Sequence, residues 1–392
     1  MITIGLNGID FSNGNFGCEA LAYSLINCIK EQCNKNNIQV KYIFFCFKYI
    51  EEKKKQLCEN LNIEYENIEF VEITIKSLRN IKNTKKYYKK CDFVIDMSGG
   101  DSFSDIYGLK RMLRESFYKL MAINNKIPLV LGPQTYGPYN KIISKIIARK
   151  IMKNATLIFS RDKKSSDMVY DISKIRTIDT TDLAIRLPYK KEKKTKNKSI
   201  GINVSALMWN KGFNGKNQFE LKVNYKKYIN ELVKSLKQKK EYEIYLISHV
   251  NASGIEDDYK LCKELAQKYN VCVAPKFKTA IEAKTFISTL NILIGSRMHA
   301  TIAAFSTEVP TISLAYSKKF EGLYKSVNYN YYIDAKKINT DEALKLTDIY
   351  IGEIDKIITA EKESLALAIR KLSVFDENLE KIILECSKKK DN

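Results

Sequence analysis

Short apolar segments alternate with segments of helical periodicity along almost the whole chain. The apolar segments, such as ITIGL at residues 2–6 and NILIG at 291–295, have the length of buried β-strands. The segments between them carry apolar residues at helical spacing, as in the helices predicted at 18–33 and 225–236. Strands that alternate with helices in this way indicate an α/β protein with parallel sheets.

The alternation is interrupted at residues 188–199, where PYKKEKKTKNKS is polar, basic and without apolar periodicity. We interpret this segment as a linker between an N-terminal domain at 1–187 and a C-terminal domain at 200–340. Residues 341–392 predict a charged helical tail. Both domains follow one plan, so we expect two Rossmann-like domains that face each other across a cleft.

Composition narrows the class of protein. The chain has 392 residues, nine cysteines without a CxxC pair and only two histidines, so we expect reduced thiols and no metal site. No apolar run reaches the roughly 18 residues of a membrane helix, and the N-terminus does not resemble a signal peptide. These features predict a cytoplasmic protein.

The formal net charge is +21, carried mostly by lysines. Two interpretations stay open: a solvated basic surface, or attraction to an anionic partner such as a phosphorylated substrate or an acidic membrane face. The sequence has no zinc-finger spacing, RNP-like segment or helix-turn-helix pattern, so we expect no binding to nucleic acid.

Clusters of Gly, Asn, Asp, Arg and His follow directly after the predicted strands. In open α/β sheets the ligand crevice lies outside the carboxyl ends of the strands, so this placement predicts an active-site cleft. The clusters are GIDFSNGNFGCE, SGGDSFSDIYG, GPQTYGPY, SRD, SHV and GSRMHA.

Two of these loops have the form of anion sites. In SNGNFGCEALAYSL, small residues around Asn15 and Glu19 bring backbone N–H groups to a helix start, although a tight strand-to-helix turn explains the segment equally well. In SGGDSFSD, two glycines permit positive φ and two aspartates bring carboxylates to a strand end. Those aspartates are either ligands or caps of the next segment. The four residues are Gly99, Gly100, Asp101 and Asp105.

The segment LIGSRMHATIAAF carries the sharpest candidate chemistry. Ser296 is predicted to cap a helix that begins near Met298, with Arg297 and His299 at its entrance. Arginine offers a planar fork for carboxylate or phosphate, and histidine transfers protons near neutral pH. His249 follows another strand, and we expect it either in the cleft or in the core.

The ordered set of motifs from about residue 5 to residue 322 resembles the polysaccharide pyruvyl transferases. The most specific parts are GGDSFSD and SRMHA…EVPTISLAYSKK. The resemblance implies a glycosyltransferase-B-like fold and transfer of a pyruvyl group from phosphoenolpyruvate to two hydroxyls of a sugar, as a cyclic ketal. Many members have an acidic residue where this chain has Cys18, which departs from the pattern of the first loop.

The implied chemistry needs an acid, cationic groups for two anions and a carboxylate on the acceptor side. We assign His299 and Asp101 as the catalytic residues. Arg161 binds the donor or pairs structurally with Asp162 or Asp182. The expected donor-binding residues are Arg297, Arg161, Ser296 and Lys318, and the expected acceptor-binding residues are Asn15, Glu19, Gly99, Gly100, Asp105, Gln134 and His249.

The expected acceptor is a sugar of a cell-surface polysaccharide or of its lipid-linked precursor, with phosphoenolpyruvate as donor substrate and no cofactor. A lipid-linked acceptor predicts peripheral contact with an acidic membrane surface. Two other functions stay open. One is a glycosyltransferase that uses a nucleotide sugar, and the other is a non-catalytic basic protein that binds glycans or membrane surfaces.

Overall fold

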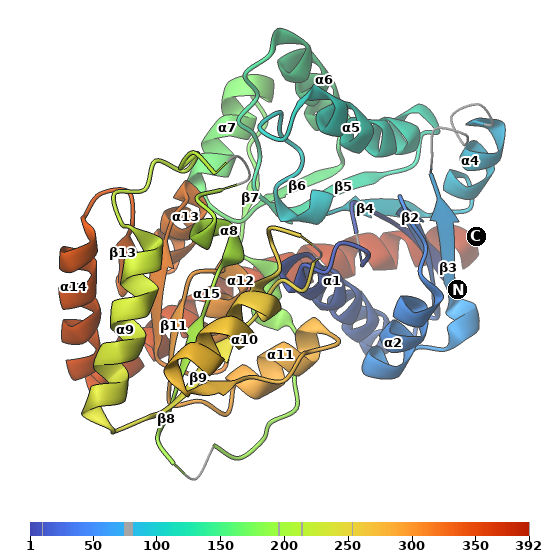
Figure 1. Ribbon diagram of the computed structural model, residues 1–392. Helices are drawn as coiled ribbons and strands as arrows, with labels where there is room; N and C mark the ends of the chain where they lie inside the picture. The colour runs from blue at the N-terminus through green and yellow to red at the C-terminus, as the bar shows by residue number, and fades with distance from the viewer. Residues whose placement is uncertain (10, 74–80, 195–196, 213–214, 253, 392) are drawn as a thin grey trace. The chain divides into compact units, whose positions relative to one another are not determined.

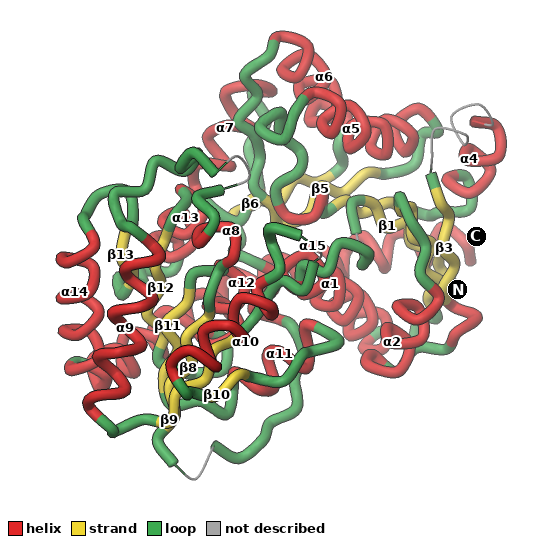
Figure 2. The backbone as a smooth tube through the Cα atoms, in the orientation of Figure 1, coloured by secondary structure: helices red, strands yellow, loops and turns green. Residues whose placement is uncertain are grey.

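A computed structural model describes residues 1–392 except 10, 74–80, 195–196, 213–214, 253 and 392. The chain divides into two compact units. Unit 1 comprises Met1–Ser12, Leu21–Leu183 and Ala368–Asn392, and unit 2 comprises Asn13–Ala20 and Ala184–Leu367. Each unit is built on its own parallel sheet, and Figure 2 shows that helices pack against both sheets.

This division differs from the expected one. Residues 184–199, with the expected linker, and residues 341–367 of the expected tail belong to unit 2, and two further segments also depart from the expected bounds. The loop and first helical turn at Asn13–Ala20 belong to unit 2, and the end of the C-terminal helix belongs to unit 1. In both places one continuous helix passes from one unit into the other. Hydrophobic periodicity shows that such a segment is helical, but it does not show which sheet each turn packs on.

Unit 1 contains a parallel sheet with the strand order β3-β2-β1-β4-β5-β6-β7 (Figure 1). The first six positions follow the doubly wound order, in which the chain changes direction between β1 and β4. The strands are β1 Ile2–Asn7, β2 Val40–Cys46, β3 Ile68–Glu72, β4 Phe93–Asp96, β5 Leu129–Gln134, β6 Leu157–Ser160 and β7 Ile178–Asp179. The helices are α1 Phe16–Lys35, α2 Glu51–Leu61, α4 Ile81–Tyr88, α5 Leu109–Asn124, α6 Ile142–Asn154 and α7 Lys163–Ser173, with short 3₁₀ turns η1 Tyr65–Asn67 and η2 Ser98–Gly100.

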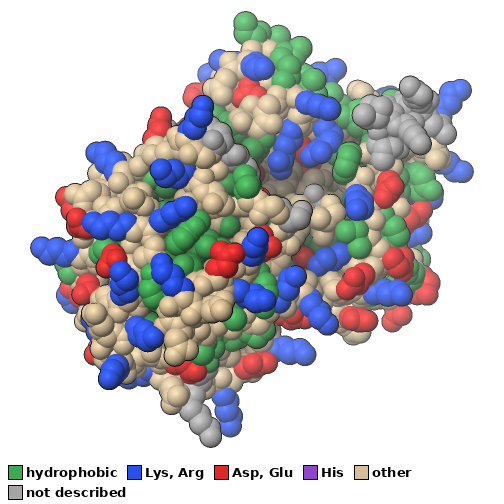
Figure 3. Space-filling view, viewed as in Figure 1, with side chains coloured by type: hydrophobic (Ala, Val, Ile, Leu, Met, Phe, Trp, Pro, Cys, Tyr) green, Lys and Arg blue, Asp and Glu red, His purple; other side chains and the backbone are tan. Residues whose placement is uncertain are grey.

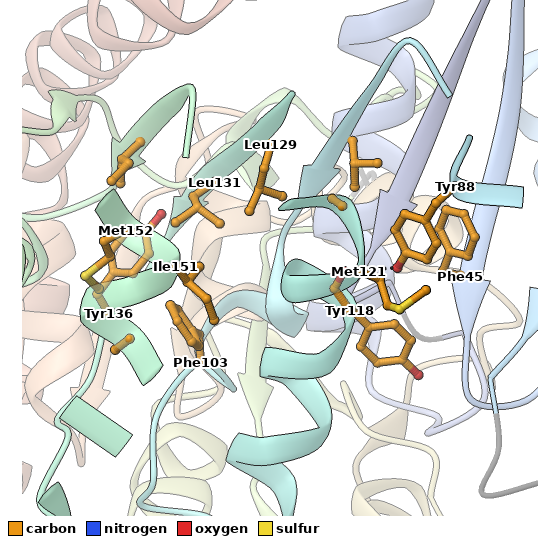
Figure 4. Close-up of a cluster of buried hydrophobic side chains, with 14 of the residues drawn as sticks. Phe45, Tyr88, Phe103, Tyr118, Met121, Leu129, Leu131, Tyr136, Ile151 and Met152 are labelled. Carbon is orange, nitrogen blue, oxygen red and sulfur yellow. Dashed lines mark hydrogen bonds between the residues drawn. The ribbon is translucent and has the colours of Figure 1, made fainter. Parts of the chain in front are cut away.

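One core cluster of unit 1 lies between its sheet and the helices α5, α6 and α7. The rings of Phe45 and Tyr88 stack with their centroids 3.9 Å apart. Figure 4 shows Leu129 and Leu131 of β5 in the same layer as side chains from α5 and α6. These strands are apolar at nearly every position because helices cover both faces of a parallel sheet.

Unit 2 repeats the plan with the strand order β10-β9-β8-β11-β12-β13, so its change of direction lies between β8 and β11. The strands are β8 Ser199–Asn203, β9 Glu243–Ile247, β10 Cys272–Val273, β11 Ile292–Gly295, β12 Thr311–Ala315 and β13 Tyr332–Asp334. The helices are α8 Ala206–Trp209, α9 Tyr225–Lys239, α10 Asp258–Tyr269, α11 Ala280–Ile287, α12 Met298–Phe305, α13 Lys318–Ser326, α14 Thr340–Gly352 and α15 Ile354–Asp391, preceded by the 3₁₀ turn η3 Leu183–Arg186.

The two sheets confirm the expected α/β class with two Rossmann-like domains. Among the residues that the structure describes, no helix combines the length and apolar character needed to cross a bilayer. All nine cysteines lie within the described residues, and none of them forms a disulfide.

Candidate active site

The first group of candidate residues lies in unit 2, at the change of direction between β8 and β11. Asn203 ends β8 and is fully buried. Its Oδ1 accepts the backbone N–H of Ser296 (3.2 Å) and of Arg297 (2.8 Å), and its Nδ2 donates to the carbonyl oxygen of Ile247 (3.0 Å). One amide therefore ties the loop after β11 to the end of β9, at the edge where open α/β sheets bind ligands.

Arg297 is held by a buried carboxylate that the sequence analysis did not identify. The Asp258 oxygens accept its Nε at 3.0 Å and its Nη2 at 2.7 Å. They also accept the backbone N–H groups of Ala206 and Val250, so one carboxylate joins three loops of unit 2. Burial acts to lower the pKa of Arg297, but Asp258 outweighs it and raises that pKa, which keeps the guanidinium charged.

His299 lies in the first turn of α12 and is half-buried. Its imidazole packs against the first turn of α1: a Cβ added to Gly17 would lie 2.8 Å from Cγ of His299 and closer still to its Nδ1. The Asn15 side chain accepts the N–H of Gly17 at 2.9 Å and so shapes this turn. The loop after β1 thus forms part of the surroundings of His299 within unit 2.

His249 is buried, with 3% of its surface exposed, and its ring packs edge-on against Phe16 at 5.7 Å. Burial, together with the charges of His299 and Arg297, lowers the pKa of His249 to about 3. The imidazole is therefore neutral at physiological pH. The sequence left open whether His249 lies in a cleft or in the core, and the structure places it in the core.

Lys319 is a second residue that sequence reasoning missed. It lies in the first turn of α13, close to Cys18, and loss of surrounding water lowers its pKa to about 8. A lysine with this pKa is charged at neutral pH but costs energy to keep dehydrated, which a bound anion would offset. The lysine expected to bind the donor was the adjacent Lys318, whose side chain lies outside the described residues.

Two other predicted site residues of unit 2, Ser296 and Glu19, have structural contacts. Ser296 does not cap α12, because Arg297 occupies the N-cap position and the Ser296 hydroxyl accepts a hydrogen bond from Tyr225 at 2.9 Å. Glu19 is 4% exposed, and its carboxylate accepts the backbone N–H of Ala280 at the start of α11. That contact is structural and holds the first turn of α1 against α11.

The second group of candidate residues lies in unit 1. Arg161 is 3% exposed, and it donates from Nη1 to Asp182 (2.7 Å) and from Nε to the hydroxyl of Thr135 (2.9 Å). Asp182 is one of the two structural partners that the sequence left open for Arg161. Gly100 adopts a positive φ of 89°, and a Cβ there would lie 3.5 Å from Nη1 of Arg161, so the glycine loop passes close to the guanidinium.

The two aspartates of this loop differ in their contacts. Asp101 is half-buried and accepts the hydroxyl of Tyr107 at 2.7 Å. Asp105 accepts the backbone N–H groups of Asn140 (2.7 Å) and Lys141 (2.8 Å) just before α6. Burial acts to raise the pKa of Asp105, but these hydrogen bonds outweigh it and lower that pKa. Asp105 therefore fixes the backbone before α6, but it does not cap a helix, because neither α5 nor α6 has a side-chain cap hydrogen bond.

A buried ion pair supports the loop that contains Gly99 and Gly100, here called the glycine loop. Lys119 and Asp96 are both fully buried, with Nζ 3.0 Å from Oδ1. Lys119 also donates to the Ser98 hydroxyl (2.6 Å), and the Gln134 amide donates to the Asp96 carbonyl oxygen (3.1 Å). Gln134, expected to bind the acceptor, is thus part of the scaffold. The lysine was missed because it lies on α5, 23 residues from Asp96 in sequence.

The structure does not bring together a metal site among the residues that it describes: no group of three or more His, Cys, Asp or Glu side chains is arranged to hold an ion.

Comparison with known proteins gives the family of the chain. A family profile described as polysaccharide pyruvyl transferase matches residues 15–318, which include the candidate residues of both units except Lys319. A search of curated proteins returned no match.

Solved structures resemble the fold at low sequence identity. UDP-GlcNAc 2-epimerase from Neisseria meningitidis has a TM-score of 0.61 at 14% identity, and the match covers 99% of this chain and 100% of the epimerase chain. MnaA of S. aureus has a TM-score of 0.58 at 12% identity with 93% and 91% covered. The 2-epimerase of Methanocaldococcus jannaschii has a TM-score of 0.57 at 12% identity, with 89% and 92% covered. Such identities support the glycosyltransferase-B type of fold alone, and on the family match the chain belongs to the polysaccharide pyruvyl transferases.

Proposed function

We propose that the protein transfers the pyruvyl group of phosphoenolpyruvate to two hydroxyls of one sugar. In the balanced reaction C3 of the donor gains a proton and C2 gains two bonds to sugar oxygens. The C2–O bond to phosphate breaks, and one hydroxyl proton replaces the one taken up by C3 while the other leaves with inorganic phosphate. The product is a cyclic ketal with a free carboxylate.

The observation that carries this proposal is a group of cationic side chains in unit 2, two of which, Arg297 and His299, lie within the family match. His299, Arg297 and Lys319 all lie in the loops or first helical turns that follow β11 and β12. Asp258 uses two of the five N–H donors of the Arg297 guanidinium and the side chain of Tyr316 uses another, so at most two remain for a ligand. A donor with one carboxylate and one phosphate needs two such cationic partners.

Each residue then has a distinct role. His299 protonates C3, which develops positive charge at C2 for attack by the first hydroxyl. Arg297 binds the donor through its planar fork, and Lys319 neutralises charge on the departing phosphate. Asp258 is a positioning residue that orients Arg297.

On the acceptor side we assign Asp101 as the carboxylate that orients or deprotonates a sugar hydroxyl. Asp101 is half-buried and accepts the hydroxyl of Tyr107, whereas the carboxylate of Asp105 is held by two backbone N–H groups. We propose a sugar of a cell-surface polysaccharide or its precursor as the acceptor. The proposed reaction uses phosphoenolpyruvate as donor and needs no further cofactor.

The test is release of inorganic phosphate from phosphoenolpyruvate in the presence of a panel of acceptor glycans, with mass spectrometry of each product. We expect acceptor-dependent phosphate release and a product that carries the ketal, both lost in His299→Asn. Parallel reactions contain nucleotide sugars, because solved structures of the same fold include an epimerase bound to UDP-GlcNAc. Glycosyl transfer from a nucleotide sugar without phosphate release from phosphoenolpyruvate would refute the proposal.

A further inference from the structure

Helix α6 of unit 1 exposes large apolar side chains. Ile142, Ile143 and Ile146 are 77%, 49% and 61% exposed. The opposite face of the helix packs into unit 1 through Ser144, Ala148, Ile151 and Met152. Three exposed isoleucines within five residues form a contiguous apolar patch of the kind that marks an interaction surface.

Basic side chains surround this patch. Residues 116–161 contain no Asp or Glu, and the basic residues in and just before α6 are all exposed: Lys141, Lys145, Arg149, Lys150 and Lys153. Within the part of the chain that the structure describes, no carboxylate lies within 4.0 Å of the side-chain nitrogens of these five residues. Figure 3 shows apolar side chains with basic ones beside them on the part of unit 1 that carries α6. The patch therefore has a strongly positive rim.

A cavity of about 480 Å³ lies beside the patch. Two cations from α6, Lys145 and Arg149, and the exposed isoleucine Ile146 line it, and among the described lining residues Asp171 is the one carboxylate. The other lining residues come from the preceding loop and from α7: Pro138, Tyr139, Asn140, Met168 and Ile172. A cavity with two cations at an apolar wall suits a phosphate group attached to an acyl chain.

We propose that α6 is a docking surface for an anionic phospholipid bilayer. The three isoleucines enter the boundary between headgroups and acyl chains, the lysines contact headgroup phosphates, and the cavity takes the phosphate of one lipid. Protein interfaces are depleted in lysine and enriched in aromatic residues, whereas helices that lie on membranes combine lysine and arginine with large apolar residues. The composition of α6 is that of a helix that lies on a membrane surface.

The experiment is sedimentation of the full chain with vesicles. Vesicles of phosphatidylcholine alone are compared with vesicles that also contain phosphatidylglycerol, at low and at high salt. We expect binding to the mixed vesicles that is at least ten-fold tighter than to phosphatidylcholine, and that weakens with salt because surface charges are screened. Equal binding to both vesicles, or no binding to either, would overturn the proposal.

Two sets of variants test the two components of the surface. Ile142→Ser with Ile146→Ser is expected to weaken binding to the mixed vesicles about ten-fold or more, while Ile255→Ser with Ile349→Ser, at other exposed isoleucines, leaves it unchanged. Lys150→Glu with Lys153→Glu is expected to abolish the preference for phosphatidylglycerol. Its matched control is Lys260→Glu with Lys263→Glu, which has the same spacing on α10.

A third outcome identifies a different occupant. If the chain self-associates in solution, and the α6 isoleucine variants abolish that association without changing vesicle binding, the patch is an interface between copies of this chain and the bilayer proposal fails. Phosphate release from phosphoenolpyruvate with a soluble acceptor is measured on the same variants. We expect it to stay unchanged, so this inference and the proposed function succeed or fail separately.

Discussion

The imidazole of His299 lies directly against the backbone of Gly17, at the first turn of α1. The contact leaves no room for a side chain at position 17, because a Cβ there would lie 2.8 Å from Cγ of the imidazole. The glycine therefore sets how far the ring of His299 extends from α12. This relationship connects the loop after β1 with the proposed acid of the reaction.

Replacement of Gly17 tests that connection. In Gly17→Ala the new methyl group displaces the imidazole, and a misplacement of about 1 Å lowers the rate of a positioned reaction by roughly a hundred-fold. We expect a loss of this order in kcat, with a change in unfolding free energy of about 1 kcal/mol or less. The control is Gly352→Ala in α14, where an added Cβ has no neighbour within 4 Å. Full activity in Gly17→Ala would show that the reaction does not depend on this ring position.

The buried pair between Asp258 and Arg297 predicts a large loss of stability. In Asp258→Ala the guanidinium stays buried without its counter-charge, and breaking such a pair costs about 3–5 kcal/mol. The adjacent Asp257 only caps α10, so Asp257→Ala should cost about 1 kcal/mol. Urea unfolding of both variants gives the comparison. Similar losses in the two would mean that Asp258 serves only as another cap.

His249 predicts a loss of stability in acid. Its pKa in the folded protein is about 3, against 6.5 in an unfolded chain. As the pH falls below about 6.5, the unfolded chain binds a proton that the folded protein does not, and so folding loses about 1.4 kcal/mol per pH unit from this group. The unfolding free energy of wild type relative to His249→Gln should decrease by this slope between about pH 6 and pH 4. A pH-independent difference would place His249 in contact with solvent.

The sequence predicted the sheets well and the site only in part, for a physical reason. Hydrophobic periodicity reports burial along one segment, so the strand ends that carry Arg297 and His299 were found correctly. It carries no information on contacts between distant segments. Asp258 contacts Arg297 from α10, and Lys119 contacts Asp96 from α5. No pattern in the sequence indicates that either pair is in contact. The prediction that Ser296 caps α12 was wrong, because its hydroxyl accepts a hydrogen bond from the distant Tyr225 instead.

Lys319 predicts a pH dependence of donor binding. Because its pKa is about 8, the ammonium loses its proton as the pH rises through that value, and the attraction for phosphate is lost with it. The KM for phosphoenolpyruvate should rise above about pH 8, and Lys319→Gln should raise KM at neutral pH and remove that rise. Lys318→Gln is the adjacent control, with a smaller effect expected. If Lys318→Gln has the larger effect, the first assignment from sequence was the correct one.

The buried pair of Lys119 and Asp96 predicts strong coupling between two substitutions. Lys119→Met removes the cation from a fully buried carboxylate and should cost about 3–5 kcal/mol in unfolding free energy. Adding Asp96→Asn removes the unpaired charge, so the double variant should recover most of that loss, as a double-mutant cycle would measure. Lys227 forms an ion pair with Asp341 at the surface, so Lys227→Met should cost less than about 1 kcal/mol. Because Lys119 also donates to Ser98 in the loop that bears Asp101, the double variant should regain stability without regaining full activity. Additive losses in the cycle would mean that the two side chains act independently and that the glycine loop is held by its backbone alone.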